Sequence, residues 1–186
     1  MTINQTLREA DQKMDKAVEV TREDFAAIRA GRAHPSMFSK LTADYYGTPT
    51  PIQQLAGFTA PEARIILVQP YDLGALPAIE RAIRDSDLGV NPSNDGKLIR
   101  CVFPELTEER RKEYVKVAKT KAEDGRVSVR NIRRTAKQNL EKLEKDGEVG
   151  KDDVTGAEKR LDSMTKKHTD AIDEMLKHKE AELIEV

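Results

Sequence analysis

Three long stretches of the sequence repeat apolar or small residues at intervals of three and four, which is the spacing of one face of an α-helix. The first stretch begins at Ile3 and predicts a helix over residues 3–29. The second begins after Thr107 and keeps its alternation for about four heptads, until the sequence "KDGEVG". The third begins at Val154 and continues towards the C-terminus. Long helices with one apolar face each therefore constrain the fold more than any other feature.

None of these predicted helices is apolar all round, so each needs partners to bury its stripe. Three stripes of this width are most simply buried against one another, in an elongated antiparallel three-helix bundle. Thr107 is placed to cap the second helix, and Glu108 and Glu109 lie in its first turn, where the helix dipole favours acids. We therefore predict a bundle domain made of residues 1–30 and 106–186.

The segment between the first two helices, residues 31–105, has a different composition. It holds all 8 prolines and six of the eight aromatic residues, which are four Phe and four Tyr. The runs "MFSKLTADYY", "ARIILVQP" and "KLIRCVF" predict extended or strand-like chain, "LPAIERAIRDSD" predicts a helix, and "LGVNPSNDG" predicts a loop. The predicted fold class is α+β: a three-helix bundle with a small β/α/β domain inserted between helix 1 and helix 2.

Two short stretches of chain, residues 30–35 and 104–106, join the inserted domain to the bundle. Glycine and proline within them predict short tethers that hold the domains close and let the angle between them vary. The predicted hinge comprises Gly31, Ala33, His34, Pro35, Pro104 and Glu105.

The second predicted helix contains a run of one charge sign. Residues 125–140, "GRVSVRNIRRTAKQNL", carry no acidic side chain, although the whole chain has 32 Lys and Arg against 33 Asp and Glu. At about 100° per residue, the basic side chains fall close to one line beside the apolar stripe. We call this line the basic row: Arg126, Arg130, Arg133, Arg134 and Lys137.

Two interpretations of the basic row are open at this point. Its members either pair with acids on the other helices, with Asp15, Glu19, Glu158 and Asp162 as candidates, or stay unneutralised so that a polyanion can dock. Like charges three or four residues apart repel by roughly 0.2–0.5 kcal/mol per pair, which favours the polyanion. Because the row lacks aromatic side chains for stacking, we expect recognition of RNA shape and backbone through arginine–phosphate contacts.

The composition and motifs argue against several other classes. A net charge of -1 argues against a generally basic, nucleic-acid-coating protein, and the single Cys101 excludes an internal disulfide and suits a reducing cytoplasm. No signal peptide or membrane span is predicted. The sequence has no glycine-rich phosphate loop or hydrolase motif, and His34, His168 and His178 lack neighbours at metal-ligand spacing. We therefore predict no catalytic residue, no cofactor and no metal site.

The remaining conspicuous residues have structural interpretations. His168 is predicted to lie in the seam of the bundle, and Cys101 to be a packed small hydrophobe. Asp152 and Asp153 are predicted to start the third helix. Tyr45 and Tyr46 are predicted to point to opposite faces of a strand.

Six segments, in this order and spanning practically the whole chain, resemble those of the bacterial ribosome recycling factors. They are "IRAGRAHPS", "DYYGTPTPIQQLA", "SDLGVNPSNDG", "PELTEERRKEYVKVAK", "VRNIRR" and "KEAELIEV". Together they are specific, whereas any one alone is a modest signal. The resemblance implies a long three-helix bundle with a small β/α/β domain inserted after the first helix and a two-stranded hinge.

The resemblance also implies a function. It implies a non-enzymatic translation factor that enters the ribosome after peptide release and, with elongation factor G and its GTP hydrolysis, splits the subunits and releases mRNA and tRNA. The implied partners are large-subunit RNA, elongation factor G and ribosomal proteins, for a monomer in the cytoplasm.

The same resemblance implies which residues contact RNA. Arg133 inherits the central role, with Arg130, Arg134, Arg126 and Lys137 beside it. Further basic positions near the hinge are Arg110, Arg111, Arg29 and Arg32. For Arg29 and Arg32 the alternative is a positive end to the first helix.

Two other functional classes remain as alternatives to a translation factor. A coiled-coil adaptor would bind a protein partner with its bundle and use the insert for recognition, and its binding would not lose salt dependence when one arginine is removed. An enzyme acting on RNA would show activity as the purified protein alone.

Overall fold

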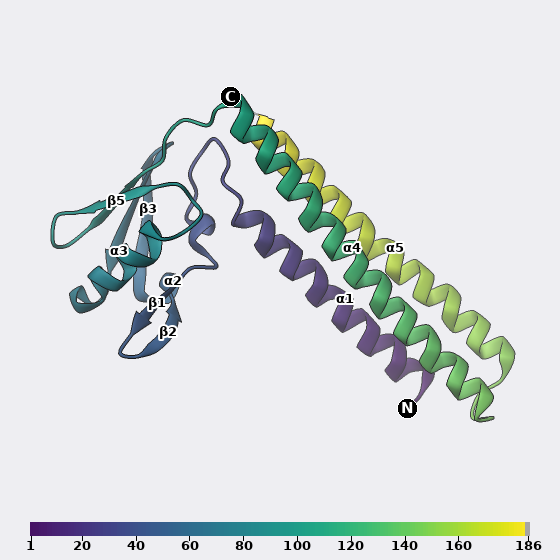
Figure 1. Cartoon of the computed structure of the whole chain (residues 1–186). Coiled ribbons are helices and arrows are strands. Elements are labelled where there is room, and N and C mark those ends of the chain that lie inside the picture. The colour runs from purple at the N-terminus through teal and green to yellow at the C-terminus, as the bar shows by residue number, and fades with distance from the viewer. Residues whose placement is uncertain (185–186) are drawn as a thin grey trace. The chain divides into compact units, whose positions relative to one another are not determined.

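The computed structural model describes residues 1–184, and their contacts divide the chain into two compact units (Figure 1). Unit 1 consists of Met1–Phe25 and Ala118–Lys179. Unit 2 consists of Ala26–Val117 and the residues from Glu180 onward. The long helices α4 and α5 thus contribute to both units, and the predicted boundaries at residues 30 and 106 lie inside unit 2.

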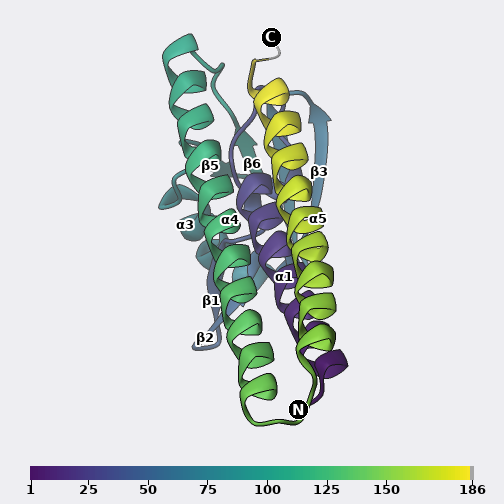
Figure 2. The same cartoon turned by 90° about the vertical axis from the view of Figure 1, so that its right-hand side faces the viewer.

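Unit 1 is the three-helix bundle that the apolar periodicity predicts. Its helices are α1 (Ile3–Ala26), α4 (Glu108–Lys145) and α5 (Lys151–Ile184). Helix α5 returns antiparallel to α4 after a short turn, and the N-terminus lies beside that turn (Figures 1 and 2). Thr107 caps α4 as predicted, because its Oγ1 accepts a hydrogen bond from the Arg110 amide at 3.1 Å. Helix α1 ends three residues earlier than predicted.

Helix α4 contributes mainly small side chains to the bundle core. Its Ala118, Ala122 and Ala136 are buried, whereas α1 and α5 contribute larger buried residues such as Met14 and Leu161. Gly125 marks the tightest point, where an added Cβ would lie 2.3 Å from Thr21 Oγ1 and 3.1 Å from Ile172 Cδ1. Side chains of α1 and α5 therefore occupy the space beside the α4 backbone at this glycine. No helix in residues 1–184 has the length and apolarity needed to cross a bilayer.

Unit 2 contains a four-stranded antiparallel sheet in the order β3-β4-β6-β5 and a separate two-stranded hairpin. The strands are β1 (Thr42–Tyr45), β2 (Thr48–Pro51), β3 (Ala56–Glu62), β4 (Ile65–Pro70), β5 (Asn91–Asn94) and β6 (Ile99–Val102). The helical segments are η1 (Pro35–Phe38), α2 (Ile52–Leu55), η2 (Leu73–Ala75) and α3 (Leu76–Arg84).

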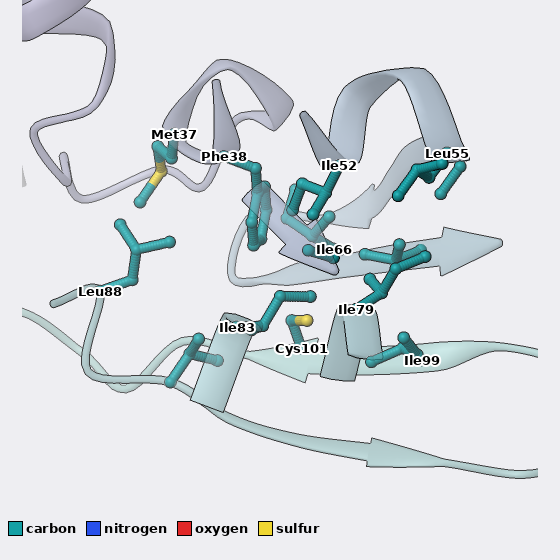
Figure 3. Close-up of a cluster of buried hydrophobic side chains, with 14 of the residues drawn as sticks. Met37, Phe38, Ile52, Leu55, Ile66, Ile79, Ile83, Leu88, Ile99 and Cys101 are labelled. Atoms are coloured by element: carbon teal, nitrogen blue, oxygen red, sulfur yellow. The ribbon is translucent and has the colours of Figure 1, made fainter. Parts of the chain in front are cut away.

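Helix α3 covers one face of the four-stranded sheet and closes an apolar core (Figure 3). Ile79 and Ile83 come from this helix, Ile66 from β4, and Ile99 and Cys101 from β6, and all five are fully buried. Cys101 is the packed small hydrophobe that the sequence predicts. Burial raises the pKa of its thiol to about 12, so the thiolate that reacts as a nucleophile is disfavoured.

Two outer strands of the sheet escaped the sequence prediction because they contain proline. β3 carries Pro61 and β5 carries Pro92, and both are edge strands, where a residue without an N–H is tolerated. The run "LGVNPSNDG" was therefore wrongly predicted to be loop throughout. The run "MFSKLTADYY" was also predicted too simply, since Met37 and Phe38 end the 3₁₀ helix η1 before β1 begins.

The prediction for Tyr45 and Tyr46 was wrong. Tyr45 ends β1, whereas Tyr46 (φ 50°) and Gly47 (φ 82°) form the two-residue turn of the hairpin. Positive φ at both turn positions is the type I′ arrangement that matches strand twist. The two rings meet edge to face at 4.5 Å between centroids, and both hydroxyls donate to Asp72 Oδ2, at 3.0 and 3.3 Å.

Candidate RNA-contact face

The basic row follows α4 through unit 1 and borders the buried seam of the bundle. Ala122, Val129 and Ala136 are buried on the seam side. Arg130 and Arg134 are exposed beside them, and the other members of the row are half-buried. Beside a buried seam, the stems of basic side chains can lie on apolar neighbours while their charged heads reach water.

Carboxylates lie against three members of the row, so the expectation that the row is left unneutralised was wrong in part. Arg126 Nε is 2.7 Å from Asp173 Oδ1, and Arg133 Nε is 2.7 Å from Asp162 Oδ1. Both acids belong to α5. Glu123, one turn before the row on α4, accepts hydrogen bonds from Arg126 at 3.0 Å and from Arg130 at 3.2 Å.

Four acids were predicted as candidate partners of the basic row. Within residues 1–184, only Asp162 pairs with it. Asp15 pairs with His168 instead, and Glu19 with Arg22 on its own helix. Glu158 has no ion pair within residues 1–184. Glu123 and Asp173 were missed. Glu123 lies on the same helix as the row, where no partner was sought, and the apolar periodicity does not determine which acids of α5 face the row.

These pairs leave much of the row available to another anion. Ion pairs between exposed groups are worth about 0.2–1 kcal/mol, so a phosphate can displace a carboxylate at small cost. Asp162 engages only Nε of Arg133, and a guanidinium has five N–H donors, so its Nη groups keep donors for a further partner. Arg134 and Lys137 have no ion pair with any residue that the structure describes.

Arg126 differs from the other arginines of the row. Its side chain is only 20% exposed, and both Nε and Nη1 are engaged by acids. The hydrogen bonds from Arg126 and Arg130 hold the pKa of Glu123 below its usual range, so the acid stays ionised at neutral pH. Arg126 therefore braces α4 against α5, whereas Arg130, Arg133, Arg134 and Lys137 present the accessible donors.

The basic residues predicted near the hinge do not form one surface. Arg29 is buried, with its guanidinium carbon 5.5 Å from the centre of the Phe103 ring, and its Nε and Nη2 lack hydrogen-bond partners. Burial lowers its pKa. Arg32 is exposed, Arg110 lies 3.6 Å from Glu113, and Arg111 donates to the carbonyl of Ile184 at 3.2 Å. Since α1 ends at Ala26, neither Arg29 nor Arg32 lies in its last turn, and the helix-end alternative was wrong.

The residues predicted as hinge differ in how firmly unit 2 holds them. The Ala33 amide donates to the Ala63 carbonyl at 2.7 Å, and His34 caps η1, which begins at Pro35. Gly31, Pro104 and Glu105 lie outside helices and strands. The backbone around Gly31 and around residues 104–105 is thus the less restrained part of the two stretches.

Known proteins are similar to this chain in sequence over nearly its whole length. Residues 21–184 match the family model described as "Ribosome recycling factor". The ribosome-recycling factor of a Nocardioides species is 77% identical over 184 residues, which are 99% of this chain and 100% of that protein. That of Streptomyces avermitilis is 65% identical over the same coverage. The chain belongs to the ribosome recycling factor family.

Solved structures extend the likeness to the fold. The solution structure of a ribosome recycling factor is similar with a TM-score of 0.79 and 38% identity, covering 100% of this chain and 99% of that one. Models of the T. thermophilus ribosome recycling factor and the E. coli elongation factor G bound to the E. coli post-termination complex give a TM-score of 0.69 and 42% identity, with 100% coverage of both chains. The α+β class and the family named from the six segments are therefore confirmed.

Proposed function

We propose that this ribosome recycling factor binds the post-termination ribosome and, with elongation factor G and GTP hydrolysis, splits it into subunits, which releases mRNA and tRNA. The observation that carries the proposal is the end-to-end likeness to the T. thermophilus factor, whose structure is described together with elongation factor G bound to a post-termination complex. A coiled-coil adaptor would have no reason to share both units with that protein.

The basic row supplies the proposed contact with large-subunit RNA. Arg133 lies in the middle of the row, and only its Nε is engaged by Asp162, which leaves the Nη donors for phosphate. Arg130, Arg134 and Lys137 extend the line along α4, and arginine forks bind phosphate in bidentate fashion. The α5 carboxylates orient the guanidinium groups before RNA arrives, so fewer rotamers are lost on binding. Arg32, Arg110 and Arg111 are proposed as secondary contacts, with Arg29 in a packing role.

The proposed activity needs no catalytic residue or cofactor in this chain. Elongation factor G would supply the energy, and this factor would set the direction by binding joined and separated subunits with different affinity. The buried, poorly ionised Cys101 fits a structural role. We propose that the protein acts as a monomer in the cytoplasm, and that unit 2 meets ribosomal proteins.

The experiment that tests the proposal follows subunit dissociation by light scattering, with elongation factor G and GTP present. We expect Arg133→Ala to bind large subunits about tenfold more weakly, a loss of about 1.4 kcal/mol, because one charged phosphate contact is removed. The slope of log affinity against log salt should fall by about one unit. Splitting at limiting factor concentration should fall with the affinity.

Arg22→Ala is the matched control, because Arg22 is an exposed arginine of unit 1 whose one ion pair within residues 1–184 is with Glu19 on its own helix. It should retain wild-type splitting and salt slope. Unchanged affinity and slope for Arg133→Ala, with the fold intact by circular dichroism, would remove the basic row from the RNA contact. Failure of the wild type to dissociate ribosomes would refute the proposed function itself.

A further inference from the structure

His168 is a buried ionisable side chain that the proposed function does not use. It lies on α5 within unit 1 and is 4% exposed. Its Nδ1 is 2.7 Å from the Met164 carbonyl oxygen, one turn earlier on the same helix. Its Nε2 is 2.7 Å from Asp15 Oδ1 and 3.6 Å from Asp11 Oδ1, both on α1. Each nitrogen of the ring therefore faces oxygen.

This arrangement calls for a cation at the Nε2 side. A carbonyl oxygen can only accept, so Nδ1 carries the hydrogen, and a neutral imidazole has a single N–H. Nε2 then presents a lone pair towards two carboxylates, which is repulsive unless a second proton or a metal ion lies between them. All the oxygens around the ring are hydrogen-bond acceptors, so they cannot by themselves satisfy both nitrogens of a neutral imidazole.

Within residues 1–184, the two acids have no basic partner other than the ring. Asp11 and Asp15 are one helical turn apart, a spacing at which like charges repel. The chain has 32 Lys and Arg, yet within residues 1–184 these two carboxylates form ion pairs only with His168. Their side chains are 46% and 68% exposed, so they can rotate and an ion can reach them from water.

The three groups have the geometry of a tridentate metal site. One nitrogen and two carboxylate oxygens all lie within 4.8 Å of one another. Ligands of a tetrahedral zinc ion, at about 2.0–2.1 Å from the metal, are ~3.3 Å apart, so small rotations of the two exposed aspartates suffice. The Met164 carbonyl accepts from Nδ1, the kind of outer contact that fixes the tautomer and orientation of a ligating histidine.

We propose that Asp11, Asp15 and His168 bind Zn²⁺, with water as the fourth ligand, and that the ion ties α1 to α5. The donor set of one imidazole and two carboxylates suits Zn²⁺ rather than Mg²⁺, which prefers oxygen ligands throughout. The site joins residues 153 positions apart in the chain, so no local spacing in the sequence announces it. Its role is structural, since it braces the bundle on the flank of α1.

The test titrates the full-length protein with Zn²⁺ alone by calorimetry and with Co²⁺ by visible absorption, which reports four-coordinate geometry. We expect one Zn²⁺ per chain, a thermal midpoint that rises with Zn²⁺, no comparable effect of Mg²⁺, and a Co²⁺ spectrum of the tetrahedral type. His168→Gln and Asp15→Asn should weaken Zn²⁺ binding by about 10-fold or more, a loss of about 1.4 kcal/mol.

Two further variants keep the test decisive if His168→Gln unfolds the bundle. Asp11→Asn removes one ligand while it leaves the 2.7 Å contact of His168 with Asp15, and it too should weaken Zn²⁺ binding by about 10-fold or more. His178→Gln changes a histidine ten residues further along α5 and should bind Zn²⁺ as the wild type does. The proposal is overturned if the wild type does not bind Zn²⁺, if Asp11→Asn binds it unchanged, or if His178→Gln abolishes binding. The contact between His168 Nε2 and Asp15 would then be held by a proton between the two side chains and not by a metal ion.

Discussion

Gly125 leaves room beside the α4 backbone for side chains of α1 and α5. Glycine in a helix interior costs about 1 kcal/mol relative to alanine, so its presence in the middle of α4 needs a compensating reason. The structure gives one, because a Cβ at this position would overlap the Thr21 hydroxyl on α1 and crowd Ile172 on α5. Thr21 cannot easily yield, since its hydroxyl donates to the Ala17 carbonyl at 3.0 Å.

We predict that Gly125→Ala lowers the free energy of unfolding by about 1–3 kcal/mol, because overpacking outweighs the better helix propensity of alanine. Urea denaturation followed by circular dichroism measures the change. Gly156→Ala is the matched control, since Gly156 lies in α5 with nothing within 4 Å of an added Cβ. It should stabilise the protein by up to about 1 kcal/mol. Adding Thr21→Ala to Gly125→Ala should recover part of the loss, and a stabilising Gly125→Ala would contradict the packing described.

At the scale of elements, one carboxylate adds polar contacts between the tip of the hairpin β1–β2 and the start of η2, beside the core packing of Ala43. Asp72 accepts from the Gly74 amide at 2.8 Å and from the hydroxyls of Tyr45 and Tyr46. These bonds, the Gly74 amide first, hold the pKa of Asp72 below its usual value. A group with a depressed pKa in the folded state adds stability above its ordinary pKa, and this addition is lost as the pH falls.

The stability difference between wild type and Asp72→Asn should therefore be largest near neutral pH. It should start to shrink as the pH falls below the ordinary aspartate pKa of about 3.9, and it should disappear only once the pH has passed below the depressed pKa of folded Asp72. Tyrosine fluorescence during urea denaturation at several pH values measures it. Asp44→Asn serves as control, because Asp44 lies on the same hairpin and its carboxylate has no hydrogen bond within the described chain. A difference for Asp72→Asn that does not vary with pH would show that charge plays no part.

The elements also show what the sequence could and could not predict. The start of α4 at Thr107 and the two long helices after it were predicted well, because a stripe repeated over many turns outweighs local ambiguity. The edge strands β3 and β5 were missed because proline argues against a strand in general. Pro61 and Pro92 are compatible with strands only at the edge of a sheet, and the sequence does not show which strands lie there. The basic row was found, but its acids were found only in part. An ion pair such as Arg126 with Asp173 depends on how α4 and α5 are rotated towards each other. The apolar pattern of one helix does not determine that rotation.

For the whole molecule, we propose that splitting the ribosome requires the angle between the three-helix bundle and the inserted domain to change. The proposed hinge lies where the backbone is outside regular structure, around Gly31 and residues 104–105, next to Ala33, which is hydrogen-bonded within unit 2. Shortening one stretch should restrict motion without touching the basic row.

Deletion of Ala30 and Gly31 is predicted to leave affinity for large subunits within about threefold of wild type, while splitting with elongation factor G and GTP falls about tenfold or more. Co-sedimentation measures the first quantity and light scattering the second. Insertion of two glycines at the same place is the control, because it lengthens the stretch without stiffening it. Equal loss of binding and splitting on deletion would argue against a hinge at residues 30–35.

The prolines that hid the outer strands from the sequence have a further consequence for the protein in a crowded cell. β3 and β5 end the four-stranded sheet, and each has a position that cannot donate to an additional strand. A strand of a second molecule that approached either edge of the sheet would meet an interrupted row of backbone hydrogen-bond donors. We therefore expect the sheet to resist extension by a strand of a second molecule.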